Sequence, residues 1–280
     1  MRGFLFQRLT ARVFGADPDG WLLQGGQALL VRYASAARLS KDIDLQYLSD
    51  SLAEAHQALL AAAATDLGDY LRFIPHQRNL AGTDTDGINQ GFDVYIGPRK
   101  VDIVHVDLVT RLSVTDTPPI VQLHPRPDLP WPTDWPKIRL YPLVDHLADK
   151  ICAMYEWRGR NFDEPSSRHR DLADILLMSQ HETIDATAAQ RALRAEAELR
   201  ATRPSLELRL PAVFEMPHAR WRAGYAKAAR DVSGLRGCAT WDAALPLAAA
   251  FLNPLLGPDF TGTWQPERGR WEPGPEKDPQ

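Results

Sequence analysis

Residues 21–45 place a glycine pair and two closely spaced aspartates at opposite ends of a helix-length segment. The apolar run 21–24 predicts a buried strand, Gly25-Gly26 predicts a turn, and the Ala-, Leu- and Arg-rich run 27–37 predicts a helix. Glycine has no Cβ, so an anion can approach the unpaired N–H groups at the helix start, where the helix dipole favours negative charge. This order of strand, turn and helix predicts a phosphate-binding turn.

Two aspartates follow the predicted helix. If residues 42–47 form a strand, Asp42 and Asp44 share one face while Ile43 and Leu45 face the core. Two carboxylates on one face repel unless a cation binds them, and oxygen ligands suit Mg²⁺ or Mn²⁺, which also bind triphosphate oxygens. Taken singly, the glycines fit an ordinary turn and the aspartates a solvated strand end. Their combination in this order favours a two-metal phosphoryl-transfer site.

The segment contains a motif of glycines, arginines, a serine and aspartates: Gly25-Gly26, then Arg32, then Arg38-x-Ser40-x-Asp42-Ile43-Asp44. This motif resembles the first motif of the AbiEii/AbiGii nucleotidyltransferase toxin family. The resemblance implies a DNA polymerase β-like nucleotidyltransferase fold, with the glycine pair on a triphosphate and the two aspartates on metal. It also implies a further carboxylate and a lysine later in the chain. One departure is Gly26-Gln27, where many relatives have Gly-Ser or Gly-Thr.

Residues 100–110 form the best predicted strand, since nearly every position is β-branched or apolar. Alternation puts Asp102 on the face of three aliphatic residues, where it would be an uncompensated charge, and Asp107 on the other face beside His105. We therefore predict Asp107 as the third carboxylate, which the family resemblance also favours. Two alternatives stay open: Asp102 in that role, or a rim position for either aspartate.

Residues 115–136 hold many of the prolines and predict an extended linker, after which residues 142–157 predict a helix. At 100° per residue, Lys150 falls within the apolar stripe of this helix. Its amine either snorkels from a partly covered face or reaches into a polar cleft to meet an anion. Helix geometry does not decide between these two interpretations.

Residues 166–179 predict a second helix that carries Asp171 and Asp174. From the residues alone, these are surface acids stabilised by neighbouring arginines. However, Leu-Ala-Asp-Lys-Ile-x-Ala at 147–153, followed by Arg-x-Arg-Asp-Leu-x-Asp-Ile at 168–175, is similar to the two C-terminal motifs of the same family. The resemblance implies that Lys150 binds nucleotide phosphate and that Asp171 or Asp174 completes the active site.

We therefore predict an α/β fold with two domains. Residues 1–140 are predicted to form a polymerase β-like nucleotidyltransferase domain that contains a mixed sheet. Residues 141–265 are predicted to form a mainly α-helical domain that closes over the nucleotide. Residues 266–280, rich in Pro, Gly and charge, predict a loose tail. Residues 212–230 mix basic and aromatic side chains. They fit either an RNA-binding segment that stacks a base or, as the favoured interpretation, a solvated helix with its aromatics turned inward.

Composition limits the function classes. Of the 280 residues, 44% are hydrophobic and 24% are charged, as in soluble globular proteins. The sequence has neither a membrane-spanning run nor a signal-peptide pattern. We therefore predict a cytoplasmic protein without a membrane partner. The two cysteines, Cys152 and Cys238, lie far apart in the sequence without partners at metal-ligand spacing, which argues against structural zinc and against a disulfide framework. A net charge of -4 excludes nucleic-acid binding over the whole surface but leaves room for a local basic patch.

The predicted activity is transfer of a nucleoside monophosphate from an NTP, with release of pyrophosphate. The predicted roles are two metal ions on Asp42 and Asp44, one of them also on Asp107; triphosphate binding by Gly25, Gly26, Ser40 and Lys150; and Arg38 offsetting transition-state charge. The resemblance implies the toxin of a bacterial toxin–antitoxin or phage-defence system, an RNA acceptor such as a tRNA 3′ end, and a separate antitoxin partner. Alternatives are a protein or small-molecule acceptor, or an inactive module that binds a nucleotide or a partner.

Overall fold

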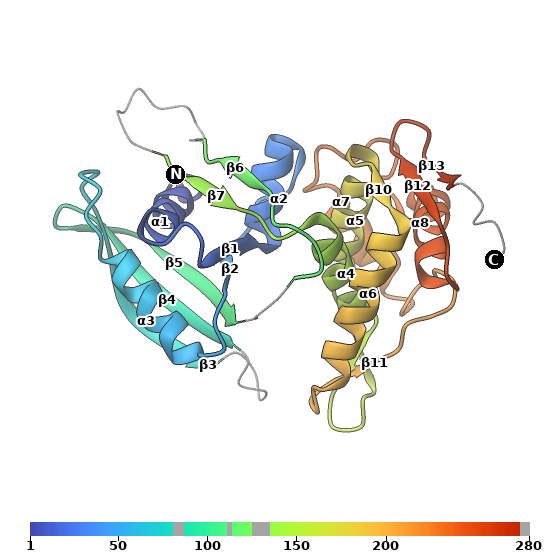
Figure 1. Cartoon of the computed structure of the whole chain (residues 1–280), viewed down its shortest axis with the longest axis horizontal. Coiled ribbons are helices and arrows are strands. Elements are labelled where there is room, and N and C mark those ends of the chain that lie inside the picture. The colour runs from blue at the N-terminus through green and yellow to red at the C-terminus, as the bar shows by residue number, and fades with distance from the viewer. Residues whose placement is uncertain (81–86, 111–113, 125–134, 275–280) are drawn as a thin grey trace, which may run out of the picture. The chain divides into compact units, whose positions relative to one another are not determined.

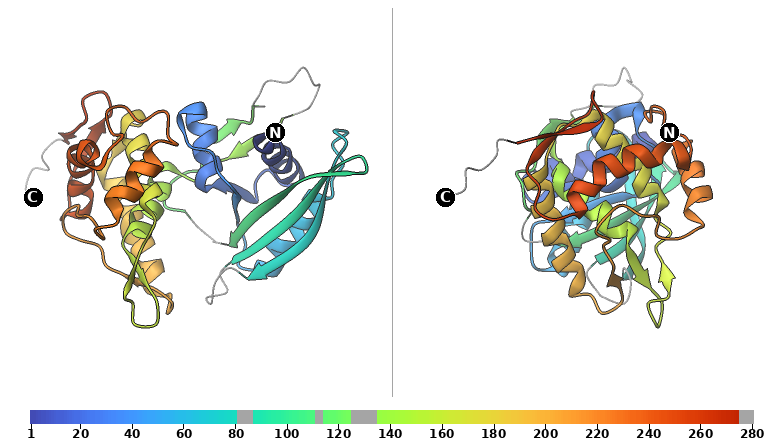
Figure 2. Two further views of the ribbon diagram at one scale, coloured as in Figure 1. Left: turned by 180° about the vertical axis from the view of Figure 1, so that it is seen from behind. Right: turned by 90° about the vertical axis from the view of Figure 1, so that its right-hand side faces the viewer.

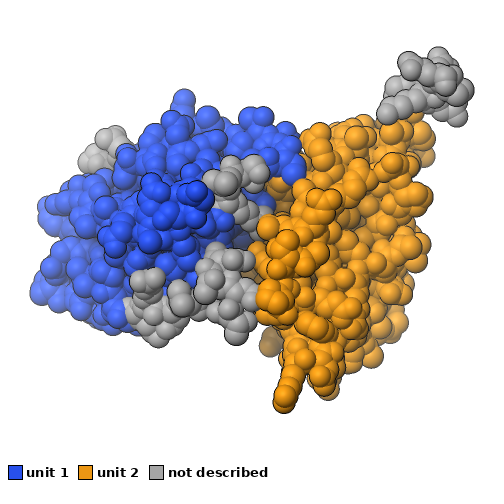
Figure 3. All heavy atoms as spheres, turned by 60° about the horizontal axis from the view of Figure 1, so that its bottom comes forward, with its two compact units in different colours: residues 1–32, 39–141 blue, residues 33–38, 142–280 orange. Residues whose placement is uncertain are grey.

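The computed structural model describes residues 1–80, 87–110, 114–124 and 135–274. The chain divides into two compact units, shown in blue and orange in Figure 3. The first unit contains residues 1–32 and 39–141, and the second contains residues 33–38 and 142–280. The domain prediction placed residues 33–38 within residues 1–140, whereas their contacts assign them to the second unit.

A five-stranded mixed sheet forms the centre of the first unit, in the order β1-β2-β5-β4-β3 (Figure 1). Its strands are β1 (Trp21–Gln24), β2 (Ile43–Tyr47), β3 (Leu71–Leu80), β4 (Gly87–Ile96) and β5 (Arg99–Thr110). Strands β2 and β5 run parallel, and the other neighbouring pairs run antiparallel. The mixed sheet confirms the predicted α/β class.

Two helices pack on this sheet, and a third follows β1 directly. They are α1 (Arg2–Ala16), α2 (Gly25–Tyr33) and α3 (Leu52–Ala63), with a short 3₁₀ turn η1 (Ala34–Ala36) after α2. Ser51 caps α3 by accepting a hydrogen bond from the Glu54 N–H at 3.2 Å. Helix α3 contacts β3, β4 and β5, which form a long ribbon beside it in Figure 2.

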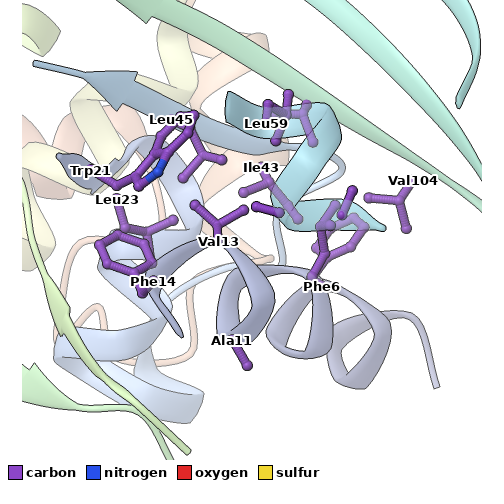
Figure 4. Close-up of a cluster of buried hydrophobic side chains, with 14 of the residues drawn as sticks. Phe6, Ala11, Val13, Phe14, Trp21, Leu23, Ile43, Leu45, Leu59 and Val104 are labelled. Carbon is purple, nitrogen blue, oxygen red and sulfur yellow. The ribbon is translucent and has the colours of Figure 1, made fainter. Parts of the chain in front are cut away.

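The core of the first unit lies between the sheet and helices α1 and α3. Ile43 and Leu45 of β2 are fully buried and lie near Val13 and Leu59 (Figure 4). The half-buried Asp44 between them fits the strand period that the sequence predicts, although Gln46 after Leu45 is also fully buried. The opposite face of β2 therefore carries Asp44.

A buried ion pair network joins α1 to the loop before β3. Asp69 accepts hydrogen bonds from Arg8 Nε at 2.6 Å and from Arg12 Nη2 at 2.6 Å. Burial by itself would raise the pKa of Asp69, but the hydrogen bonds from Arg12 and Arg8 outweigh it and hold that pKa below its ordinary value. The carboxylate thus remains ionised inside the first unit.

The first unit ends with a small two-stranded sheet. Strand β6 (Ile120–Gln122) lies in the proline-rich segment and pairs antiparallel with β7 (Lys137–Arg139). The prediction of an extended segment over 115–136 agrees with β6, but residues 125–134 lie outside the described part of the chain. After β7, Leu140 bridges to Leu23, which ties the end of the unit to β1.

The longest elements of the second unit are helices. They are α4 (Leu143–Met154), α5 (His169–His181), α6 (Ala186–Ala201), α7 (Trp221–Ala229) and α8 (Trp241–Leu256). Two small sheets accompany them: β8 (Glu156–Arg158) with β9 (Glu164–Pro165) and β11 (Glu207–Leu208), and β10 (Ile184–Asp185) with β12 (Gly262–Gln265) and β13 (Arg270–Pro273). Helix α4 packs against α5 and α6. None of the helices that the described residues form has the length and apolar character of a membrane span.

The C-terminal hairpin differs from the loose tail predicted from residue 266. Strands β12 and β13 pair antiparallel, and Trp271 stacks on Phe251 with ring centroids 5.7 Å apart. The ring centroid of Trp271 also lies 5.5 Å from that of Trp264. Aromatic burial therefore orders a segment whose proline, glycine and charge content suggested a loose chain. Residues 275–280 lie outside the described range.

Candidate active site

The glycine pair lies where β1 passes into α2. Gly25 has φ +61°, a left-handed conformation that favours glycine. A Cβ at Gly25 would collide with the carboxylate of Asp44, and one at Gly26 would lie 2.8 Å from Ser40 Oγ. The absence of side chains at this turn therefore makes room for two of the predicted site residues. Binding of phosphate by the backbone of Gly25 and Gly26 stays a prediction.

The carboxylate face is formed by Asp44 and Asp107, with Asp42 directly before β2. Asp44 and Asp107 are register partners in the parallel pair β2–β5. Their neighbours on either side, such as Ile43 and Val106, are fully buried in the core, so both carboxylates belong to the opposite face. The parallel register thus brings together two acids that are far apart in the sequence.

Asp107, rather than Asp102, is the aspartate of β5 that lies opposite Asp44. Asp102 pairs with Val94 toward the start of the strand, and its carboxylate accepts a hydrogen bond from the Ile103 N–H at 2.8 Å. That contact gives Asp102 a local partner and explains how it is tolerated near the aliphatic face. Assignment of Asp107 as a metal ligand remains a prediction.

Asn89 is a residue of this face that sequence reasoning missed. Its side-chain amide donates to Asp107 Oδ1 at 2.5 Å, because Asn89 of β4 is the antiparallel partner of Asp107. Burial raises the pKa of Asp107; the hydrogen bond from Asn89 opposes this rise, and the charge of Asp42 adds to it. The hairpin register was the signal that would have identified Asn89, but it cannot be read reliably from residue types alone.

Ser40 has a different partner from the one predicted for it. Its hydroxyl donates toward the Asp42 backbone oxygen at 2.9 Å and Asp42 Oδ1 at 3.1 Å. A hydroxyl has one hydrogen to donate, so Ser40 orients Asp42 in this structure. Contact between Ser40 and a triphosphate remains a prediction.

The donor chemistry of the carboxylate face suits a hard cation. Asp42, Asp44 and Asp107 offer only carboxylate oxygens, the ligands that Mg²⁺ and Mn²⁺ prefer, and the raised pKa of Asp107 reports a site where negative charge is disfavoured. Across the described ranges, however, no three His, Cys, Asp or Glu residues are grouped closely enough to form a ready-made metal centre. These three aspartates are the residues that would hold a cation.

A second charged group, the ion cluster, lies within the second unit and consists of Arg38, Lys150, Arg168, Asp171 and Asp174. Lys150 of α4 is only 3% exposed, so its amine does not snorkel to the surface. The ammonium lies 2.7 Å from Asp174 Oδ2 and 3.1 Å from Asp171 Oδ1, both on α5. The amine in the apolar stripe therefore meets two buried carboxylates of its own chain.

Charge balance keeps these buried groups ionised. Burial would lower the pKa of Lys150, but the charges of Asp171 and Asp174 outweigh it and raise that pKa. Burial would likewise raise the pKa of Asp171, but Lys150 and Arg168 outweigh it and hold that pKa well below its ordinary value. Asp171 and Asp174 are therefore buried ion-pair partners, and the surface-acid interpretation of them is wrong.

Arg38 belongs to this cluster, although it stands two residues before Ser40. Its Nε and Nη2 donate to the two oxygens of Asp174 at 3.1 and 2.9 Å, a bidentate pair. The first motif of the sequence is thus divided between the units: Arg38 lies in the second, and Ser40, Asp42 and Asp44 lie in the first. Residue spacing alone could not indicate this division.

The aromatic residues of the basic segment turn inward. Trp221 and Tyr225 of α7 are buried, and their polar atoms donate to Ser166 O at 2.9 Å and Cys238 O at 2.6 Å. Stacking of a base on these two rings is therefore excluded in this conformation, which confirms the favoured interpretation. Basic side chains stay on the surface of this segment: Arg220, Arg222, Lys227 and Arg230.

The chain is similar to a family of toxins and to several solved structures. The model of the family described as "Nucleotidyl transferase AbiEii toxin, Type IV TA system" matches residues 7–246. Similar solved structures include JHP933 from Helicobacter pylori, at 12% identity over 91% of this chain and 90% of that one, with a TM-score of 0.47. The nucleotidyltransferase toxin MenT4 from Mycobacterium tuberculosis H37Rv has 17% identity over 88% and 87%, with a TM-score of 0.48. No curated protein matches the sequence.

Proposed function

The chain belongs to the AbiEii family of nucleotidyltransferase toxins, and we propose that it transfers a nucleoside monophosphate from an NTP to a hydroxyl group of an RNA, in particular a tRNA 3′ end. The observation that supports this most is the pairing of Asp44 with Asp107 beside the glycine turn of Gly25. Clustered carboxylates next to a helix start suit metal-assisted transfer of a nucleotide phosphate. The RNA acceptor implies a cytoplasmic protein, and the family implies an antitoxin that counteracts it.

The carboxylate face carries the chemistry in this proposal. Asp42, Asp44 and Asp107 would hold Mg²⁺ or Mn²⁺, and the ion would supply positive charge to stabilise the transferring phosphoryl group. The acceptor oxygen forms a bond to the α-phosphorus, the bond from that phosphorus to pyrophosphate breaks, and the hydroxyl proton passes to a carboxylate. Asp107, which lies opposite Asp44 on this face, is proposed for this last role.

Phosphate binding is assigned to two groups of residues. Gly25 and Gly26 contribute backbone N–H groups at the start of α2, and Ser40 orients Asp42 beside them. In the second unit the ion cluster contributes positive charge through Arg38 and Lys150, with Asp171 and Asp174 as their partners. The expected closure of the helical unit over a nucleotide stays a prediction.

The acceptor proposal is supported by a small basic surface. Arg220, Arg222 and Lys227 are exposed, and the aromatic rings of the same segment are buried. Contact with RNA is therefore proposed to be electrostatic, through phosphates, without base stacking. The acidic net charge of -4 restricts such contact to a local patch.

Incubation with each labelled NTP and total cellular RNA tests the proposal, with RNA, protein and small molecules separated before counting. We expect label on RNA from at least one NTP, and none on RNA whose 3′ hydroxyl is blocked. The Asp42→Asn variant serves as the inactive control. Label found only on protein or on a small molecule would contradict the RNA acceptor but support nucleotidyl transfer. Absence of label from every fraction would favour the alternative of an inactive module that binds a nucleotide or a partner.

The basic surface is tested by replacing Arg220, Arg222 and Lys227 together with Ala. Fewer phosphate contacts should weaken RNA labelling and flatten its salt dependence, while NTP binding stays unchanged. The matched control removes the same charge elsewhere on the second unit, with Ala at three other exposed arginines: Arg160, Arg194 and Arg268. Equal loss of RNA labelling in both triple variants would indicate a general charge effect and exclude a local contact.

A further inference from the structure

A cavity of about 490 Å³ lies at one edge of the sheet in the first unit, between the end of α3 and strand β3. This volume is within the range of ligand-binding pockets. Its lining is mostly apolar and includes Ala63, Ala64, Leu71, Phe73 and Pro75. Strand β3 is the outer strand of the sheet, and β4 separates it from β5, which carries Asp107. The cavity is therefore separate from the carboxylate face.

The backbone of β3 alternates between residues that pair with β4 and residues that face away from it. The Gly97 N–H donates to Tyr70 O at 3.4 Å, which places Tyr70 among the pairing residues. By alternation, Leu71, Phe73 and Pro75 direct their backbone groups away from β4, toward the open edge. Another backbone could add to the sheet at this edge.

The chain covers this edge on both sides of Phe73. At Leu71, the N–H donates to Asp69 Oδ1 at 3.1 Å and the carbonyl accepts from Arg12 Nη2 at 3.0 Å. Pro75 has no N–H to donate. In the described part of the chain, the N–H and the carbonyl of Phe73 have no partner on this side of the strand. The open edge is therefore short, and Phe73 offers one donor and one acceptor there, beside the cavity.

Large apolar side chains are exposed around the cavity. Tyr70 is 73% exposed, and Ile74 of β3 and Ile96 of β4 are 44% and 45% exposed. Tyr70 also has φ +59°, a left-handed conformation that is unfavourable for a residue with a large side chain. Exposed apolar side chains beside an open strand edge are typical of an interaction surface.

The charge at the end of α3 favours a cationic ligand group. Asp66 is exposed at the cavity, and one of its oxygens accepts a hydrogen bond from the Gly68 N–H at 2.8 Å. The last carbonyl groups of α3 add negative partial charge nearby. Arg72, the basic residue of the lining, already donates to Gly97 O at 2.9 Å and lies over the Tyr95 ring. A basic residue of a ligand therefore meets a carboxylate here.

We propose that this edge and cavity form a docking site for an extended segment of a partner protein. The segment adds antiparallel to β3, and one of its residues exchanges two hydrogen bonds with Phe73. Directly opposite residues point their side chains to the same face, so this residue places an apolar side chain in the cavity. A Lys or Arg nearby in the segment meets Asp66. The covered positions at Leu71 and Pro75 keep the pairing short.

The backbone of Phe73 favours a peptide over a small apolar molecule, because its N–H and carbonyl recognise another backbone. A second copy of this chain fits less well. In a symmetric pair the residue opposite Phe73 would be Phe73 of the copy, whose side chain is buried in its own core. The occupant is therefore a segment that brings a free apolar side chain.

Synthetic peptides test the site. The probes are labelled seven-residue peptides, Lys-Thr-Thr-X-Thr-Thr-Lys with blocked ends, in which X is Leu, Ile, Phe or Ser. Fluorescence anisotropy with the full chain measures their dissociation constants. At least one apolar peptide should bind about 10- to 100-fold more tightly than the Ser peptide, the value of burying one apolar side chain. Methylation of the backbone nitrogen of X should weaken that binding about 10-fold, because X can no longer donate to Phe73 O.

Hydrogen exchange measured by NMR locates the contact. The bound peptide should slow exchange of the Phe73 N–H about 10-fold or more. The Leu71 N–H is the matched control, since it already donates to Asp69 and should change little.

Filling the cavity provides a test on the protein side. Ala64→Trp places a large ring at an exposed position of the lining and should remove the advantage of the apolar peptides over the Ser peptide. Ala61→Trp, exposed on α3 outside the lining, is the matched control and should bind as wild type does. Melting temperatures show whether both variants fold. If Ala64→Trp does not fold, the methylated peptide still decides the assignment.

Three results would overturn the docking site. The first is binding by none of the apolar peptides, and the second is equal binding of the apolar, Ser and methylated peptides. The third is slower exchange of the Phe73 N–H at higher protein concentration without peptide, which would assign the edge to a second copy of the chain. None of these measurements uses nucleotidyl transfer, so the docking site and the proposed function fail independently.

Discussion

The carboxylate face of the first unit and the ion cluster of the second treat charge in opposite ways. On the carboxylate face, burial and the neighbouring charge of Asp42 raise the pKa of Asp107. In the ion cluster, Lys150 and Arg168 outweigh burial and lower the pKa of Asp171. Negative charge is thus unfavourable at the first group until a cation arrives, whereas the chain itself neutralises it at the second. The first group is therefore suited to bind a cation, whereas the acids of the second already have cationic partners in the chain.

The largest expected effect is on activity. Asp44→Asn removes an oxygen ligand and should lower nucleotidyl transfer by about 100-fold or more, the scale of losing one group that stabilises transition-state charge. Thermal stability should hold or rise, because the change also removes one of the carboxylates that share this face. Asp42→Asn should behave in the same way. Retained transfer with an unchanged melting temperature would exclude the metal role of these residues.

Removing a carboxylate from the ion cluster should affect stability instead. Asp174→Ala leaves the Lys150 ammonium with one carboxylate in a buried site and should cost about 3 kcal/mol of unfolding free energy. Asp44→Ala in the first unit should cost less than about 1 kcal/mol. Urea unfolding of the two variants, each compared with wild type in EDTA, measures this difference. Similar costs for both would remove the contrast between the two groups.

Gly25→Ala should combine a moderate stability cost with loss of function. The left-handed conformation at φ +61° costs a side chain about 1–2 kcal/mol, and the added Cβ would also push the Asp44 carboxylate away. Gly68→Ala is the matched control, since Gly68 has φ +66° in the same unit and open space around its Cβ position. Both variants should lose the stability that the left-handed conformation costs, and Gly25→Ala should lose more because its Cβ also meets Asp44, but only Gly25→Ala should lose transfer activity. If Gly25→Ala and Gly68→Ala had equal transfer activity, the reaction would tolerate a shift of the Asp44 carboxylate.

The smallest expected effect is the dependence of stability on pH, because the groups concerned titrate in the acid range. The folded-state pKa of Asp171 lies below its ordinary 3.8, so its stabilising contribution is complete above that value and is lost as pH falls through the folded-state pKa. Asp69 contributes with the same sign. Asp107 contributes with the opposite sign, because its raised pKa makes the ionised form unfavourable as pH rises through it. In EDTA, the melting temperature plotted against acid pH should therefore have a smaller slope for Asp171→Asn than for wild type. For Asp107→Asn this slope should be larger.

Local patterns predicted several elements of the fold. The period-2 pattern of residues 100–110 marks β5 to within a residue, and the apolar run 21–24 marks β1. Ser51 caps α3 because a serine before a helical run offers its hydroxyl to the third N–H. The predictions that failed were those that depend on distant partners, such as the loose tail from residue 266, which aromatic stacking on Phe251 orders.

Sequence by itself determined which residue types were available for chemistry: a glycine turn, two aspartates at a strand start and a third within an apolar strand. These depend on neighbours in the chain, since backbone conformation and alternation are local properties. Only the tertiary structure decided that Asp107 lies opposite Asp44, that Asn89 donates to it, and that Arg38 meets Asp174 in the second unit. Strand register and buried ion pairing join residues far apart in the sequence, and their energies depend on burial, which no local pattern encodes.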